Sequence, residues 1–137
     1  MNKYDKLFEV EKELRGLETF GELIHDNNHA GTLEDPMPWP YFKYVPQVEK
    51  LIMEIYNFEQ ENPDFDLKNY QAIIENASPG EKALGKVDVE NASEQLVMAL
   101  FMAMVRAERF CDGFILGIFD DRIPFKWFDR LHVLTGE

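Results

Sequence analysis

Hydrophobic residues recur at three- and four-residue steps through much of the chain, which is the spacing of one face of an α-helix. The first such stripe comprises Tyr4, Leu7, Phe8, Leu14 and Leu17. A second helix is predicted to begin at Pro46, a residue suited to the first helical turn, and to end before Pro63. A short third helix should follow Asp66, which we expect to act as its N-cap.

The strongest helical pattern lies at residues 96–105, where ten apolar residues follow one another. A helix that is apolar on every side is normally central and buried. Asn91 and Glu94 resemble a capping box and predict where this helix begins. Residues 78–90 form a loop before it, and two short helices should follow at residues 114–119 and 125–134, the last opened by Pro124.

The stretch from residue 25 to residue 44 has a different character. Pro36, Pro38 and Pro40 each fix φ and lack an amide donor, so they exclude a helix. We expect an extended arm or a short irregular hairpin. Its aromatic rings should lie across the helical body, namely Trp39, Tyr41, Phe42 and Tyr44.

These patterns predict an all-α fold, with five or six helices around residues 96–105 and an irregular proline- and aromatic-rich arm. The alternative is an α+β fold with one short hairpin in the arm. A length of 137 residues fits a single helical domain over residues 1–137, because the pieces on either side of each loop are too short to fold separately.

Composition narrows the classes of partner. The chain has 14 Lys and Arg against 26 Asp and Glu, a formal net charge of −12. Such a surface repels the phosphates of nucleic acids and anionic lipids, so neither is an expected partner. The acidic surface could alternatively mimic DNA, but a net charge of −12 is also a common way for a protein to remain soluble.

Cys111 is the single cysteine, so no intramolecular disulfide can form. The N-terminal segment lacks the apolar core of a signal peptide, and the ten-residue apolar run is too short to cross a membrane. These features predict a cytoplasmic protein. We expect the Cys111 thiol to be buried and inert; a nucleophilic role would need a nearby base such as His25, His29 or His132.

The octet RAERFCDG at residues 106–113 is the main candidate site, because the apolar helix leads directly into four charges. Arg109 and Asp112 are three residues apart and could pair on a helix. Arg106 and Arg109 share a face and need a carboxylate, carbonyls or an anionic ligand between them. The octet is therefore either a structural ion-pair network, in which Asp112 could cap the next helix, or an anion pocket in which Glu108 or Asp112 serves as acid or base.

The octet, together with the ending W-F-D-R-L and the element Met37-Pro38-Trp39-Pro40-Tyr41-Phe42, resembles a family of small bacterial domains of unknown function. That family ends in R-x-E-R-F-C-D-G and carries M-P-Y-P-x-Y upstream, so Trp39 and Phe42 depart from its pattern. The resemblance implies a shared fold and a shared surface around Arg106, Glu108, Arg109, Asp112 and Trp39. It implies no reaction.

Two further features suggest weaker hypotheses. His25 and His29 have the four-residue spacing of a zinc pair, but only scattered carboxylates such as Glu34 and Asp35 could supply a third ligand. The composition of the segment is also typical of a helix end, so no metal is predicted. Trp39 and Tyr41 could line a groove for a partner peptide or a flat ligand. Phosphate-binding, dinucleotide-binding and nucleophile-elbow motifs are absent from the sequence.

The sequence therefore favours a non-catalytic binding or interaction module that uses no cofactor. A protein partner or a homodimer through exposed aromatics is expected. The alternative is an enzyme or sensor for a small anionic, nucleotide-like metabolite bound by Arg106 and Arg109. The two differ in whether these guanidiniums are fully paired or line an open pocket.

Overall fold

The computed structural model describes residues 2–25, 31–36 and 39–137. Within these ranges the chain forms six α-helices and one antiparallel hairpin. The helices are α1 (Asp5–Arg15), α2 (Pro46–Glu61), α3 (Tyr70–Ala77), α4 (Glu94–Glu108), α5 (Phe114–Asp120) and α6 (Ile123–Thr135); the strands are β1 (Gly21–Ile24) and β2 (Tyr41–Tyr44). Short 3-10 helices lie at Pro63–Phe65, Leu67–Asn69 and Leu84–Lys86. The predicted helical fold is confirmed, and the short hairpin of the alternative is present as well.

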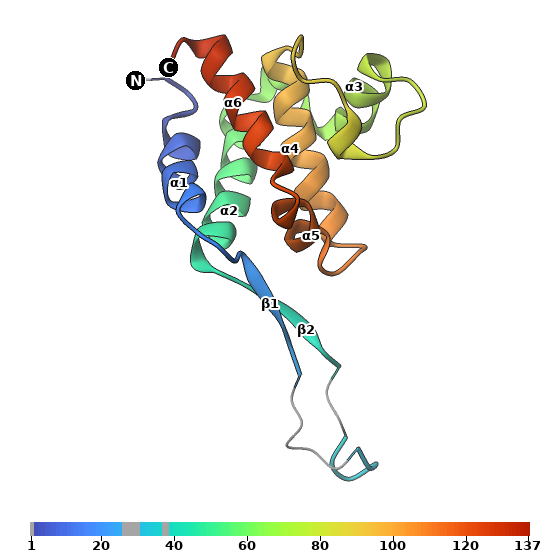
Figure 1. Ribbon diagram of the computed structural model, residues 1–137. Coiled ribbons are helices and arrows are strands. Elements are labelled where there is room, and N and C mark those ends of the chain that lie inside the picture. Colours follow the sequence, from blue (N-terminus) through green and yellow to red (C-terminus); the bar gives the residue numbers. More distant parts are fainter. Residues whose placement is uncertain (1, 26–30, 37–38) are drawn as a thin grey trace.

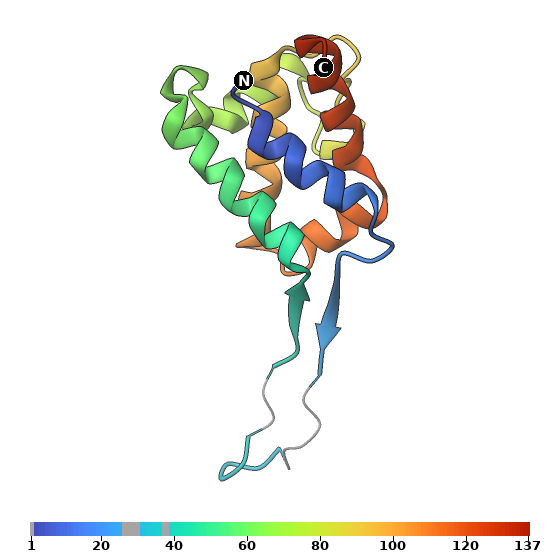
Figure 2. The same cartoon turned by 90° about the vertical axis from the view of Figure 1, so that its left-hand side faces the viewer.

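The helices form one body and the hairpin extends away from it (Figures 1 and 2). Helix α4 contacts α2, α3, α5 and α6, while α1 packs against α2 and α6. The two chain ends meet at the other end of the body, where the side-chain amide of Asn2 donates to the Glu137 carboxylate at 2.6 Å. The hairpin therefore lies opposite the termini.

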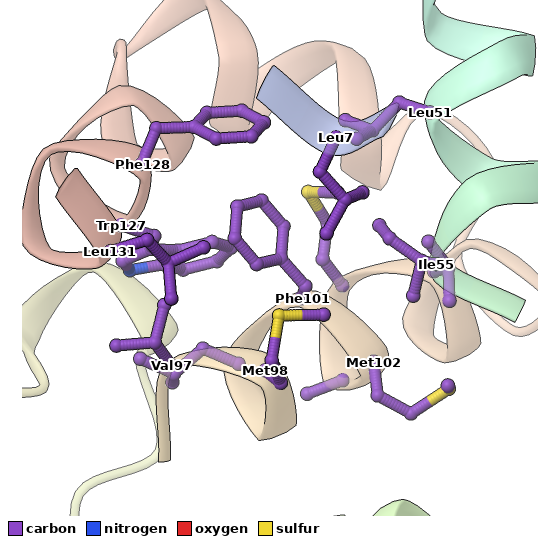
Figure 3. Packing of buried hydrophobic residues seen from close by; sticks show 14 of the residues in the cluster. Leu7, Leu51, Ile55, Val97, Met98, Phe101, Met102, Trp127, Phe128 and Leu131 are labelled. Atoms are coloured by element: carbon purple, nitrogen blue, oxygen red, sulfur yellow. The ribbon is translucent and has the colours of Figure 1, made fainter. Parts of the chain in front are cut away.

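The core is built on α4, as its sequence predicts. All ten residues from 96 to 105 are buried. The ring of Phe101 lies 5.1 Å from that of Trp127 and 4.9 Å from that of Phe128, both on α6 (Figure 3). On the other side, Leu51 and Ile55 of α2 are fully buried against the same cluster. Each such side chain contributes about 1.5–3 kcal/mol of transfer free energy, so this helix holds the body together.

Helix α4 begins later than the capping-box pattern predicts. Its N-cap is Ser93, whose hydroxyl accepts a hydrogen bond from the Leu96 amide at 3.1 Å. Asn91 lies in the preceding turn, and the Glu94 carboxylate accepts from the Tyr4 hydroxyl at 2.6 Å instead. The prediction of an Asn91–Glu94 box is therefore wrong, because Glu94 is used to attach the start of α1.

The hairpin pairs Gly21 with Tyr44 and Ile24 with Tyr41. Successive side chains of a strand point to opposite sides. Phe42 and Tyr44 are accordingly half-buried against the body, whereas Tyr41 is 55% exposed. Trp39 precedes β2 at the end that points away from the helices, and it is 90% exposed. The expectation that all four rings lie across the body is therefore wrong for Trp39 and Tyr41.

Candidate functional site

The predicted octet forms the end of α4 and the turn into α5. Helix α4 ends at Glu108, and the amide of Cys111 still bonds back to the Ala107 carbonyl at 2.9 Å. Gly113 then has a φ of +88°, a left-handed conformation that glycine adopts without steric cost. A Cβ at this position would lie 2.6 Å from Cζ of Phe42, so the glycine also lets β2 approach the turn.

Glu108 joins this turn to the hairpin. Its carboxylate accepts from the amides of Gly113 at 2.9 Å and Ile115 at 2.8 Å, and from the Tyr44 hydroxyl at 2.7 Å. The Leu116 amide in turn donates to the Tyr44 hydroxyl at 3.2 Å. A negative group is favourable at a helix N-terminus, so Glu108 and Tyr44 together cap α5.

The environment of the cap changes the titration of Tyr44. Burial and the hydrogen bond to Glu108 raise the pKa of Tyr44 above its ordinary value of 10.0.

Asp112 does not have the capping role that the sequence suggested. It is exposed and makes no capping hydrogen bond to α5, so the expectation that it caps this helix is wrong. The physical reason is that Glu108, at the last position of α4, already fills this place: its carboxylate accepts from the amides five and seven residues ahead.

The two arginines lie over one aromatic ring. The guanidinium carbons of Arg106 and Arg109 are each 5.7 Å from the centroid of the Tyr56 ring on α2. Arg106 is half-buried and its Nε is buried without a hydrogen-bond partner, whereas Arg109 is exposed. Neither guanidinium forms an ion pair with any residue in the described ranges. The pair that Arg109 and Asp112 could form is not made, and both guanidiniums instead make a cation–π contact with Tyr56.

Arg106 also borders a cavity of about 650 Å³ between α3, α4, the loop before the 3-10 helix at residues 84–86, and the start of α5. Lys82 is the other cation on its wall. Glu75 and Glu81 also line it, and each carboxylate accepts a loop amide, from Gly80 at 3.1 Å and Ala83 at 2.9 Å. The remaining wall is mainly apolar and comprises Tyr70, Gln71, Ile74, Leu84, Ala103, Ala107, Phe110 and Phe114. Arg109 is not among the residues of this wall.

Trp39 and Tyr41 lie on the hairpin arm, which extends from the end of the body where Glu108 and Tyr44 meet (Figure 1). Leu33, also on the arm, is fully exposed. Both strand edges of the two-stranded sheet lack a third strand among the described residues. The structure therefore does not bring the predicted site residues together. Arg106 borders the cavity, Glu108 caps α5, Arg109 and Asp112 are exposed at the end of α4, and Trp39 and Tyr41 lie on the arm.

Cys111 is exposed, so the expectation of a buried thiol is wrong. It follows the end of α4, where the apolar pattern of that helix no longer applies. His25 is exposed, and His29 lies outside the described residues. Over residues 2–25, 31–36 and 39–137, no three His, Cys, Asp or Glu side chains are grouped to hold a metal ion.

One buried polar cluster escaped the sequence analysis. Glu11 of α1 is only 4% exposed, and its carboxylate accepts from Arg15 at 2.5 Å and contacts Nε2 of His132 at 2.6 Å. The His132 ring stacks on Phe8 at 4.1 Å, and Arg15 also reaches Asp129 at 2.6 Å. The four-residue spacing of Glu11 and Arg15 could have signalled this pair, but its link to α6 is long-range. Tyr44 and Tyr56, the partners of Glu108 and the arginines, had no such local signal.

Comparisons with known proteins assign the chain to a family but give no related protein of known function. Neither the curated proteins nor the solved structures include a match to it. In the described part of the chain, no helix has both the length and the apolar character needed to cross a membrane. A family model described as a family of unknown function, DUF6508, matches residues 2–137. Because this match spans nearly the whole chain, the protein belongs to the DUF6508 family.

Proposed function

We propose that this protein is a non-catalytic binding module whose hairpin arm docks on a protein partner. The observation that carries the proposal is the Trp39 ring, which is 90% exposed on an arm that extends from the helical body. Leu33 and Tyr41 add exposed apolar surface to the same arm. Exposed aromatic residues are enriched among the side chains that dominate binding energy at protein interfaces.

The form of the arm supports the same proposal. A two-stranded hairpin is marginally stable alone in water, and a strand edge without a neighbour can accept another strand. A partner that covers the rings and edges would stabilise the arm. The partner is another protein or a second copy of this chain. An exposed, unpaired Cys111 suits a reducing compartment, which supports a cytoplasmic location.

Capture from native cytosol with matched baits tests this function. Trp39→Ala should lose partners that the wild type retains, while Met53→Ala should keep them. Met53 is a suitable control because it is 61% exposed but lies on α2, outside the arm. All baits must share the wild-type melting temperature, and light scattering over a range of concentrations would detect self-association. If both variants retain the same partners, or if nothing binds and the chain stays monomeric, the proposal is wrong.

A second candidate function is the binding of a small anionic metabolite, as a sensor or an enzyme, at the cavity beside Arg106. The observation that favours it is Arg106, which borders an open cavity and forms no ion pair with any described residue. Glu108 accepts three hydrogen bonds at the start of α5. In this proposal Glu108 therefore has a structural role and does not act as an acid or base. A thermal-shift screen of anionic metabolites against the wild type and Arg106→Met tests this candidate.

A further inference from the structure

We infer that the cavity beside Arg106 takes a small monocarboxylate with an apolar body, an inference that rests on the second candidate function above. The size of the cavity suits such a ligand. Its volume of about 650 Å³ lies within the range of about 300–1,000 Å³ that is typical of small-molecule sites. Ile74, Leu84 and Phe114 supply apolar wall against which the body of a ligand can pack.

The polar end of the ligand is indicated by Arg106. The residue borders the cavity, and its guanidinium, whose carbon lies 5.7 Å from the centroid of the Tyr56 ring, has no carboxylate partner among the described residues. A cation without a counter-charge beside an open cavity favours an anionic acceptor there. A carboxylate matches the planar fork of a guanidinium and can accept two parallel hydrogen bonds.

The other charges of the cavity limit the ligand to a low negative charge. Glu75 and Glu81 lie on the same wall, and hydrogen bonds to Gly80 and Ala83 hold their carboxylates in place. Arg106 and Lys82 only balance these two charges, and the chain as a whole carries −12. A nucleoside triphosphate would bring several negative charges against this balance, whereas a single carboxylate brings one.

The apolar body of the ligand is indicated by Phe110. This side chain borders the cavity and is 90% exposed, although most large apolar side chains of the chain are buried. A hydrophobic ligand that covers the ring would remove this apolar surface from water, which favours binding. The carboxylate at Arg106 and the apolar body toward Phe110 together define an amphiphilic acid.

Calorimetric titration with a matched ligand series tests the inference. The probes are octanoate and 4-phenylbutanoate, with octanamide as the uncharged match, octylamine as the cationic match, and AMP and ATP as nucleotides. We expect both carboxylates to bind, and octanamide to bind at least about tenfold more weakly, a difference of about 1.4 kcal/mol. Octylamine and ATP should not compete with octanoate.

Variants assign the binding to this cavity. Arg106→Met should weaken octanoate binding by about tenfold or more, and Arg106→Lys should weaken it less because the charge remains while the fork is lost. Lys126→Met on α6 removes an exposed cation outside this cavity and should leave binding unchanged. If Arg106→Met does not fold, the affinity of Arg106→Lys for octanoate still shows whether Arg106 takes part in binding.

The outcomes separate the ligand class from the proposed function. Equal binding of octanoate and octanamide, or octanoate binding that ignores Arg106, would overturn the inference. If nucleotides bind through Arg106 and carboxylates do not, the ligand class is wrong while the anion-binding function stands. If no anion binds, both are wrong.

Discussion

Glu108 illustrates how one side chain can join distant parts of this fold. Its carboxylate holds the first amides of α5 and the hydroxyl of Tyr44, a residue 64 positions earlier in the chain. The charge pattern of the octet identifies Glu108 as unusual, but local spacing points to pairing within the octet. The true partners are backbone amides and a hairpin tyrosine, so the residue was found and its contacts were not.

Replacing Glu108 with alanine should therefore destabilise the protein. The change leaves two amides and the Tyr44 hydroxyl without their acceptor, which predicts a loss of about 2 kcal/mol in the free energy of unfolding. Asp112→Ala is the matched control, because this exposed carboxylate does not cap α5 and should change stability by less than about 0.5 kcal/mol. Urea unfolding of the two variants checks this, and equal losses would contradict the capping role.

Tyr44 predicts how stability changes at alkaline pH. Burial and the hydrogen bond to Glu108 raise its pKa above 10.0, so the folded state keeps the proton that the unfolded state releases. The stabilisation from Tyr44 is thus complete below about pH 10 and is lost as the pH rises toward the folded pKa. The stability difference between the wild type and Tyr44→Phe should shrink above about pH 10.

Urea midpoints measured at several values between about pH 8 and pH 11.5 test this pH dependence. Tyr41→Phe is the control, because Tyr41 is 55% exposed and loss of its hydroxyl should leave the alkaline profile of the wild type unchanged. A wild-type advantage over Tyr44→Phe that stays constant across this range would show that the Tyr44 proton is not linked to folding.

At the scale of the elements, the helices were predictable and the contacts of the arm were not. The apolar run at residues 96–105 is buried on all sides, as its composition alone implies. Proline spacing correctly excluded a helix from the described arm residues, but it does not predict which aromatic side chains of the arm face the helical body. Whether Phe42 or Tyr41 faces the body depends on strand alternation and on the position of α5, which local sequence does not contain.

The cavity was also beyond sequence reasoning, for a related reason. Arg106 belongs to the octet, but Ile74, Glu75 and Leu84 come from α3 and from the loop before α4. These segments meet Arg106 only after α3 packs on α4. An arginine at the end of an apolar helix predicts that a counter-group or a ligand is needed, whereas the shape of the site requires the tertiary structure.

The contact between β2 and the start of α5 depends on Gly113. Gly113→Ala places a side chain at a φ of +88° and a Cβ 2.6 Å from the Phe42 ring. The left-handed conformation alone costs about 1–2 kcal/mol, and the displaced ring adds to this. Gly117→Ala, inside α5, is the control, because nothing lies within 4 Å of its Cβ position and alanine favours a helix by about 0.5–1 kcal/mol.

Chemical denaturation of four variants separates the two contributions at Gly113. The loss caused by Gly113→Ala should be smaller in a Phe42→Ala background, since only the backbone strain remains, while Gly117→Ala should be neutral or stabilising. Identical losses in both backgrounds would mean that β2 and α5 do not meet as described.

At the scale of the whole molecule, the helical body packs around one buried cluster in which the outer arm takes no part. The buried cluster draws its side chains from all six helices, while the described residues between β1 and β2 contribute none to it. Hydrogen bonds from the amides of Gly31 and Thr32 end on the Asp35 carbonyl, within the arm itself. Removing the outer arm should therefore abolish binding and leave the body folded.

The decisive variant replaces residues 25–40 with Asn-Gly. Ile24 and Tyr41 are paired across the hairpin, so a two-residue type I′ turn can join them without changing the register. Phe42 and Tyr44 remain and keep their contacts with Gly113 and Glu108. The free energy of unfolding should stay within about 0.5 kcal/mol of the wild type, while capture of the partner or self-association is lost. If the shortened chain fails to fold cooperatively, the arm is required for folding. If it folds and still binds, the partner site lies on the helical body and the proposed role of the arm is wrong.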